Sequence, residues 1–286
     1  MSDAQLKTIY RYPVKSMGGH TLNATLLTAK GIPGDRCWAL QDDAHGGIKG
    51  GKRFPAIMGM SAELLDTPSQ TMRSPPVKIT LSNGSTLLSD DQDANDRLSD
   101  AVGSPVSLWP LLPEDQLAHY KRTPPPPGTD PIDALRQVFG RTPDEPLPDL
   151  KGFPEVLIAY ESPPGTYFDA YPLLILSESS MAALTTSTDQ SNFDVRRFRP
   201  NLLISINEVG FPEDQWAGRE AKLGGARLKL DRICPRCIMT THGFADLPKD
   251  PKIMRQLVQQ NGGNLGLYAS VVEPGEITLG DTLELI

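Results

Sequence analysis

The sequence has few cysteines, no long apolar run and no excess of positive charge. Its three cysteines are too few for a disulfide framework, and an odd number is expected of reduced thiols. No stretch approaches the ~18 consecutive apolar residues that cross a bilayer as a helix. The formal net charge of −7 argues against broad electrostatic contact with nucleic acid or an anionic membrane. We therefore expect neither nucleic acid nor a membrane as a partner.

Two sequence signals that would redirect the functional assignment are also missing. Residues 1–7 lack the apolar core of a secretory leader, so a cytoplasmic location is expected. The glycine pairs at 46–47 and 50–51 lack the strand–turn–helix context of a dinucleotide-binding fingerprint. The 286 residues are enough for about two domains.

Proline is abundant and unevenly placed. Of 27 prolines, fourteen lie between Pro110 and Pro172. Because proline removes a backbone donor and breaks helices and central strands, residues 121–170 are expected to form a long surface connection. A short helix is expected near Pro131–Phe139. The connection is either a plain linker or a lid over a site, and the sequence favours the linker.

Short alternating segments on both sides of this connection predict a mainly β protein with some α-helix, of the α+β class. Strands are expected at Leu6–Tyr12, Leu22–Leu27, Cys37–Gln41, Val77–Leu81 and Val106–Leu108, and later at Leu173–Leu176, Leu202–Ile206, Ala226–Leu230, Leu267–Val272 and Thr282–Ile286. Helices are expected from Ser177 towards Leu184 and over Lys252–Gln260. The predicted domains are residues 1–120 and 171–286, joined by 121–170. The first is expected to be a small antiparallel sheet or barrel.

Cys234 and Cys237 form a C-x-x-C pair directly after an apolar strand. Arg236 between them would favour a thiolate. Structural zinc needs four ligands, and only His242 lies near enough to suggest a third. A redox dithiol would start a helix, whereas residues 238–241 are expected to be extended. Two buried structural cysteines are equally compatible with the spacing, which does not decide among these hypotheses.

Other motifs suit an anionic ligand. YPVKSMGG (12–19) runs from a strand into a glycine turn with Lys15 and Ser16 at its mouth. GIPGDRCW (31–38) places Arg36 at the entry to a strand, and RRFRPN (196–201) precedes a buried one. Guanidinium groups match phosphate oxygens, and an asparagine offers donors and acceptors to a heterocycle. Each motif alone is more typical of a solvated surface.

Together, and in this order, the motifs resemble those of the MOSC proteins, relatives of the C-terminal domain of molybdenum cofactor sulfurase. The succession is YPVKS, GDR-x-W, RRFRPN, F-x-E-D-x-W (211–216), CPRCIMTT (234–241) and LGLYASVVEPGEITLGD (265–281). The chain is similar in particular to the mitochondrial amidoxime-reducing component. The resemblance covers nearly the whole chain, from Tyr12 to Asp281, and implies an N-terminal β-barrel-like domain followed by a MOSC β-barrel domain.

The resemblance also implies a molybdenum cofactor (Mo-molybdopterin) and its contacts. Cys237 matches the cysteine that binds the metal, and it is therefore also a candidate catalytic residue. The matching cofactor contacts are Lys15, Ser16, Arg36, Ser177, Arg199, Asn201, Pro235, Arg236 and Tyr268. A thiolate is a soft ligand for such a metal, and cationic donors anchor phosphate.

The sequence departs from the family pattern after Thr241, where the family continues with an acidic turn. Residues 242–248 read HGFADLP here. His242 is a candidate proton donor in catalysis, although the sequence favours an ordinary loop histidine. Asp246 is a second, weaker candidate.

The leading hypothesis is a molybdenum-dependent reductase of small N-hydroxylated substrates. No four-cysteine iron–sulfur motif is present. Electrons are therefore expected from separate proteins, cytochrome b5-like or ferredoxin-like together with a flavin reductase. The alternatives are a sulfur carrier or cofactor-handling protein with a persulfide on Cys237, and a metal-free enzyme with a nucleophilic thiolate.

Overall fold

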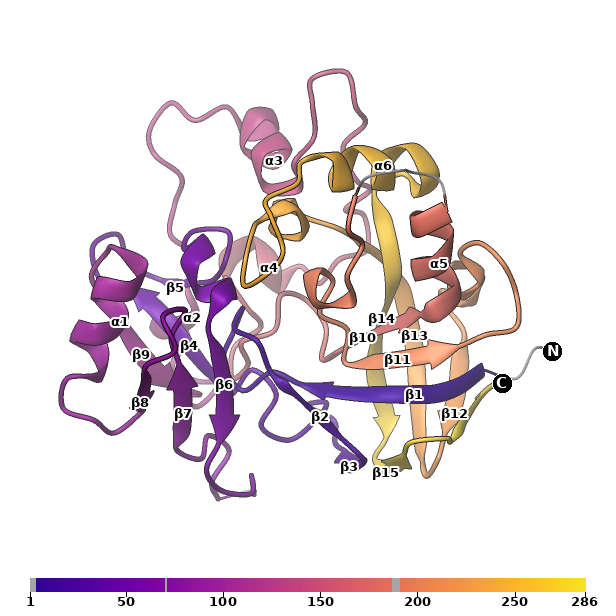
Figure 1. The fold of residues 1–286 in the computed structure, drawn as a ribbon, viewed down its shortest axis with the longest axis horizontal. Helices are drawn as coiled ribbons and strands as arrows, with labels where there is room; N and C mark the ends of the chain where they lie inside the picture. Colours follow the sequence, from indigo (N-terminus) through magenta and orange to yellow (C-terminus); the bar gives the residue numbers. More distant parts are fainter. Residues whose placement is uncertain (1–3, 70, 187–190) are drawn as a thin grey trace.

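A closed β-barrel forms one half of the molecule and two small sheets form the other (Figure 1). The computed structural model describes residues 4–69, 71–186 and 191–286. The α+β class and the order of the two domains are as the sequence predicts. The proposed boundaries at 120 and 170 stay predictions.

Seven strands of the described chain close the barrel in the order β11-β10-β14-β13-β12-β16-β1, because β1 pairs again with β11. The β10–β11 pair is parallel and the other pairs are antiparallel. The strands are β1 (Ala4–Arg11), β10 (Leu173–Ser177), β11 (Leu202–Ser205), β12 (Glu220–Leu223), β13 (Ala226–Pro235), β14 (Asn264–Glu273) and β16 (Thr282–Leu285). The first strand of the chain thus completes the C-terminal barrel, and β2 (His20–Leu22) extends from it.

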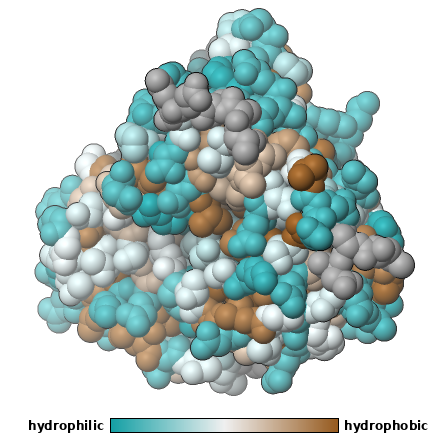
Figure 2. Space-filling model, turned by 45° about the vertical axis from the view of Figure 1, so that its right-hand side comes forward, coloured by the Kyte–Doolittle hydropathy of each residue, from teal (hydrophilic) through white to brown (hydrophobic). Residues whose placement is uncertain are grey.

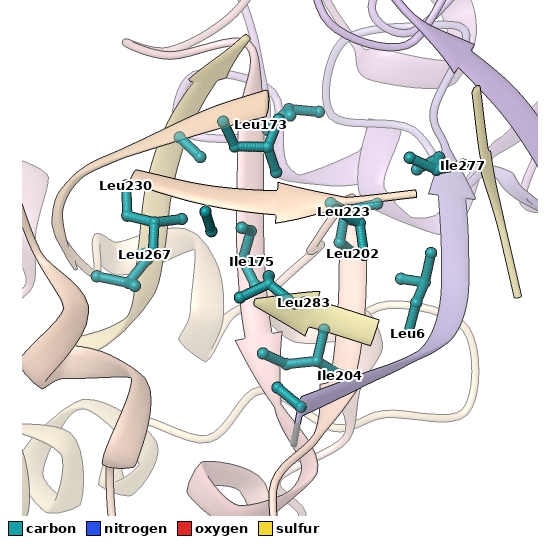
Figure 3. Packing of buried hydrophobic residues seen from close by; sticks show 14 of the residues in the cluster. Leu6, Leu173, Ile175, Leu202, Ile204, Leu223, Leu230, Leu267, Ile277 and Leu283 are labelled. Atoms are coloured by element: carbon teal, nitrogen blue, oxygen red, sulfur yellow. The ribbon is translucent and has the colours of Figure 1, made fainter. Parts of the chain in front are cut away.

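Alternating apolar residues fill the barrel. In Figure 3, leucine and isoleucine side chains from different strands converge on its interior. Leu6, Leu202 and Leu267 are fully buried there, as every second residue on the inner face should be. A closed barrel has no free sheet edge, because each strand has a hydrogen-bonded neighbour on both sides. The strands therefore fix the positions of the loops at the rim of the barrel.

The N-terminal half contains two three-stranded antiparallel sheets among its described residues, β5-β4-β9 and β6-β7-β8. Their strands are β4 (Trp38–Asp42), β5 (Ile48–Lys49), β6 (Ser61–Leu64), β7 (Val77–Thr80), β8 (Thr86–Leu88) and β9 (Val106–Pro110). Helix α1 (Ala94–Val102) and the 3-10 turn η1 (Pro55–Gly59) cover this core. Across the halves, β3 (Ala24–Leu27) pairs with β15 (Gly275–Thr278). The expected single strand Leu22–Leu27 is therefore split at Asn23 between β2 and β3.

The proline-rich connection contains the helix that the sequence predicts, α3 (Pro131–Phe139). The Asp130 side chain caps its start by accepting from two backbone amides, and Gly140 ends it in the left-handed conformation. Short turns α2 (Leu117–Tyr120) and α4 (Val156–Ala159) flank it. The connection returns to the centre of the molecule at Tyr167, whose side chain is fully buried.

Helices α5 (Glu178–Thr186) and α6 (Lys252–Asn261) pack on one side of the barrel (Figure 1). The remaining 3-10 turns are η2 (Val195–Arg197), η3 (Pro212–Trp216) and η4 (Ile238–Thr241). The expectation that residues 238–241 are extended is wrong. Cys237 itself has extended backbone, and the chain then turns because Thr240 and Thr241 hydroxyls bond carbonyls three residues back.

Candidate cofactor site

A polar pocket lies where loops of the N-terminal half meet the rim of the barrel. Nine of the ten predicted cofactor residues line it: Lys15, Ser16, Arg36, Arg199, Asn201, Pro235, Arg236, Cys237 and, from β14, Tyr268. Among the described lining residues are five cationic side chains and one carboxylate. The pocket is therefore positively charged within a protein of net charge −7, and it suits an anion.

The YPVKS motif carries Lys15 into the pocket. Its backbone amide donates to Trp38 O at 2.8 Å, which fixes the turn against β4. The side chain is only 8% exposed, and its Nζ donates to Asp169 Oδ1 at 2.7 Å and to Tyr167 O at 2.8 Å. Burial lowers the pKa of Lys15, and the charge of Asp169 opposes that shift. Lys15 is thus a buried cation neutralised by an acid from the connection.

Asp169, the acidic partner of Lys15, was not predicted from the sequence. Desolvation raises its pKa, but the charges of Lys15 and Lys52 more than offset this and hold the pKa well below its usual range. Its side chain is 58% exposed, so the carboxylate stands at the open side of the pocket. The connection therefore contributes directly to the site, beyond the linker role that the sequence favours.

Three of the predicted residues have unusual backbone conformations. Ser16, Arg36 and Arg199 have φ angles of 68°, 48° and 54°. Non-glycine residues seldom adopt this left-handed region, and each such residue costs on the order of 1–2 kcal/mol. Strain of this kind tends to persist where it serves a site. Here it aims three polar side chains into one pocket.

Two arginines stack on the buried ring of Tyr12. Arg199 lies 4.3 Å and Arg36 lies 5.1 Å from its centroid. Burial lowers the pKa of Arg199 to about 10, partly opposed by Tyr12. Arg36 pairs with Asp35 and donates to Asn201 Oδ1 at 3.2 Å. Burial acts to lower the pKa of Arg36, but Asp35 outweighs it and the pKa is raised. Both guanidinium groups therefore lie against the same aromatic ring.

The two cysteines of the C-x-x-C pair differ in environment. Cys234 is buried, and Arg236 Nη1 lies 3.2 Å from its sulfur. Burial raises the pKa of the Cys234 thiol, which Arg236 only partly offsets. Cys237 is partly exposed and lines the pocket. Cys237 is thus the sulfur that a ligand can reach, and Cys234 packs beneath it against Arg236.

Lys52 follows the glycine turn 50–51 and is a further, exposed cation that interacts electrostatically with residues of the pocket. A Cβ at Gly50 would lie 2.5 Å from Ser16 Oγ, so any side chain at position 50 would displace that hydroxyl. Desolvation acts to lower the pKa of Lys52, but the charges of Cys237 and Asp169 raise it above its ordinary value. Lys52 is therefore a protonated amine whose charge interacts with the accessible sulfur and with the exposed carboxylate.

Two predicted site residues lie outside the described lining of the pocket. The hydroxyl of Ser177 donates to Glu213 Oε2 at 2.6 Å, in a buried network that includes Ser180. His242 is half-buried, with burial and Lys249 lowering its pKa, and its carbonyl accepts from Arg197 Nη1 at 2.8 Å. Asp246 is an exposed partner of Arg196 at 2.7 Å. Ser177, His242 and Asp246 are thus not among the residues that line the pocket.

Among the described residues, no group of three or more His, Cys, Asp or Glu side chains is placed to hold a metal ion. Within the same residues, no helix combines the length and apolar character that a bilayer crossing needs. The surface face in Figure 2 is mostly hydrophilic, with hydrophobic residues in small patches.

Family comparisons agree with this architecture. Residues 3–103 match the MOSC N-terminal beta barrel domain, and residues 164–284 match the MOSC domain. The chain is a two-domain MOSC protein. The match to the MOSC domain begins at residue 164, within the predicted connection. The matched region therefore includes Tyr167 and Asp169, the two residues that accept hydrogen bonds from Lys15.

Curated relatives of this MOSC protein carry two kinds of name. Bovine mitochondrial amidoxime reducing component 2 is 25% identical over 300 residues, covering 96% of this chain and 80% of that protein. Human mitochondrial amidoxime-reducing component 1 is 41% identical over 133 residues, covering 42% of this chain and 38% of that protein. Rice molybdenum cofactor sulfurase is 25% identical, covering 84% of this chain and 28% of the sulfurase. These names connect the family with molybdenum-cofactor chemistry.

Proposed function

We propose that this MOSC protein binds a molybdenum cofactor and reduces small N-hydroxylated compounds with electrons from a separate electron-transfer protein. The donor would be a cytochrome b5-like protein, or a ferredoxin-like protein with a flavin reductase. The observation that carries the proposal is the convergence of one accessible sulfur, Cys237, with cationic side chains from both domains. The names of the relatives support the reaction class.

The donor set fits a pterin cofactor that carries phosphate and a metal. Arg199 Nη2 and Arg236 Nε are buried beside the pocket without a hydrogen-bond partner among the described atoms. Buried donors of this kind need acceptors, which a phosphate or a pterin ring offers. The enclosed space is about 80 Å³, which is smaller than a whole pterin. Binding therefore requires long side chains such as those of Lys15 and Arg36 to move.

In this proposal the residues divide the work by chemistry. Lys15, Ser16 and Arg36 bind the phosphate, Arg199 and Asn201 bind polar atoms of the ligand, and Cys237 supplies the sulfur that coordinates the metal. Pro235, Arg236 and Tyr268 fix the geometry around that sulfur. The bound cofactor supplies two-electron redox chemistry.

Reduction of an N–OH group to N–H takes up two electrons and two protons and releases water. Lys52, whose charge interacts with that of Cys237, is the residue we assign to hold one proton on the side of the sulfur. His242 stays a candidate donor of the second proton, although it is not among the described residues that line the pocket.

The proposal is tested with protein from a host that makes the cofactor. Benzamidoxime reduction is measured with a chemical electron donor, for wild type, Cys237→Ser and Cys234→Ser. We expect turnover in wild type, at least a hundredfold loss in Cys237→Ser, and substantial activity in Cys234→Ser. Equal activity in wild type and Cys237→Ser would show that this sulfur is not part of the reaction.

A second candidate function is a sulfur carrier, favoured by the partial exposure of Cys237 and by the sulfurase relative. There a persulfide on Cys237 would be stabilised by Lys52 and Arg236. A labile sulfur adduct on Cys237, found by mass spectrometry in protein without molybdenum, favours this function over the reductase.

A further inference from the structure

A second cavity of about 480 Å³ lies on another side of the Asp35–Arg36 turn. Its walls come from four places in the chain: residues of the stretch 26–37, the residues Pro68, Ser69 and Arg73, Leu111, and residues of the connection between 165 and 168. The size is within the usual range for a small-molecule pocket. Nothing in the proposed reductase or sulfur-carrier chemistry uses this space.

Hydrogen bonds between its walls give this cavity a fixed shape. Arg73 Nη2 donates to Gly165 O at 2.7 Å and so joins two of the segments. Ser74 Oγ donates to Cys37 O at 2.8 Å. Thr28 and Gly31 bond each other through both backbone amides, at 3.0 and 2.8 Å. A ligand would therefore meet a largely preformed site and would lose little binding free energy to ordering it.

The walls are mainly apolar, with positive charge at the edge. Ile32, Phe168 and Leu111 contribute apolar surface. Lys30 and Arg73 are exposed cations that also line the cavity. Lys30 pairs with Glu114 only at 3.4 Å, with the two side chains 54% and 74% exposed, which leaves it available to another anion.

The carboxylate in the wall, Asp35, is already satisfied. Its Oδ1 accepts from the backbone amide of Tyr12 at 2.8 Å, and its Oδ2 accepts from Arg36. It is also almost fully buried, at 4% exposure. The charge that the cavity offers to a ligand is therefore the positive charge of Lys30 and Arg73.

We propose that this cavity is a binding site for a small amphipathic carboxylate, with an acyl or aromatic body against the apolar walls and its anionic head between Lys30 and Arg73. An amine of the same shape would bring its charge against both cations, and a carboxylate without an apolar body would leave the walls unfilled. Binding needs both features, and Arg36 is a wall residue that this cavity shares with the cofactor pocket.

Isothermal titration calorimetry on the full chain tests this site with octanoate, octylammonium and acetate at low millimolar concentrations. We expect one saturable site for octanoate and at least tenfold weaker binding of the other two. Absence of saturable octanoate binding overturns the proposal, and so does equal binding of octylammonium.

Three variants place the site on the structure. Arg73→Gln removes a cation and should weaken octanoate binding about tenfold. Ala29→Phe, at a small exposed lining residue, fills the cavity and should weaken it at least as much. Arg219→Gln, at an exposed arginine beside β12, is the matched control and should bind like wild type. Unchanged binding in a folded Ala29→Phe variant overturns the assignment, whatever the Arg73 variant does.

Discussion

Replacing Asp169 by asparagine should tighten the binding of phosphate at Lys15. The buried ammonium of Lys15 is neutralised by Asp169 at 2.7 Å, and an arriving phosphate must compete with that carboxylate. Asparagine keeps the size of the side chain and removes its charge. Lys15 would keep its hydrogen bond to Tyr167 O and would remain available to an anion.

The size of the effect follows from the exposure of Asp169. Its side chain is 58% exposed, so a dielectric close to that of water applies. Removing one negative charge about 5 Å from a phosphate dianion then lowers the binding free energy by about 1.5 kcal/mol, which is roughly tenfold in Kd. Salt at ~0.5 M should remove most of the difference.

Calorimetric titration with inorganic phosphate at pH 7 and low salt measures this effect, with Asp66→Asn as a control at an exposed aspartate outside the pocket. We expect a Kd about tenfold lower for Asp169→Asn and no change for Asp66→Asn. Weaker phosphate binding in Asp169→Asn would refute the reasoning, because it would mean that the carboxylate keeps Lys15 charged rather than competing for it.

Substitutions at three further positions test the backbone and a buried charge. Ser16→Gly should raise the free energy of unfolding by about 0.5–1 kcal/mol because it relieves the left-handed strain, and Ser16→Ala should not; equal thermal shifts for both would refute the strain. Gly50→Ala should displace the Ser16 hydroxyl, because the added Cβ would lie 2.5 Å from its oxygen, and should weaken phosphate binding several-fold in calorimetry. Unchanged phosphate binding would contradict a role of that hydroxyl in holding the anion. Burial raises the pKa of Asp214 to about 6, so the folded state binds its proton more tightly than the unfolded chain, and stability falls as pH rises from about 4 through 6. Asp214→Asn should therefore stabilise the protein by about 1 kcal/mol at pH 8, since partial exposure of the carboxyl weakens the effect, and by less at pH 5. Urea titrations that show a larger stabilisation at pH 5 than at pH 8 would refute the direction of the pKa shift.

Most of the barrel could be predicted from the sequence because alternating apolar residues and short continuous apolar runs both indicate buried strands. The strand predicted at Leu173–Leu176 is observed as Leu173–Ser177, and the helix predicted at Lys252–Gln260 as Lys252–Asn261. The assignment of β1 to the C-terminal barrel was not predictable in this way. Its pairing with β11 joins residues nearly two hundred positions apart, and local periodicity carries no information on such partners.

The site shows the same division between local and long-range information. The motifs identified Lys15, Arg36, Arg199 and Cys237 as candidates, and the structure brings these four together. Asp169 had no motif of its own, because its role depends on how the proline-rich connection returns to the pocket.

The conformation of residues 238–241 and the hydrogen-bond partner of Ser177 could not be predicted, because both depend on contacts that the local sequence pattern does not encode. Residues 238–241 form a 3-10 turn rather than a strand because threonine hydroxyls bond the backbone. Ser177 fits the cofactor pattern by sequence, yet in the structure it bonds Glu213.

Molybdenum and pterin content of the purified protein tests the central claim most directly. Wild type and Cys237→Ser are expressed in a host that makes the cofactor, and each is measured by elemental mass spectrometry and by pterin fluorescence after oxidation. We predict close to one molybdenum and one pterin per wild-type chain, and loss of molybdenum in Cys237→Ser. Wild-type protein with neither molybdenum nor pterin, or Cys237→Ser with an undiminished molybdenum content, would contradict the account.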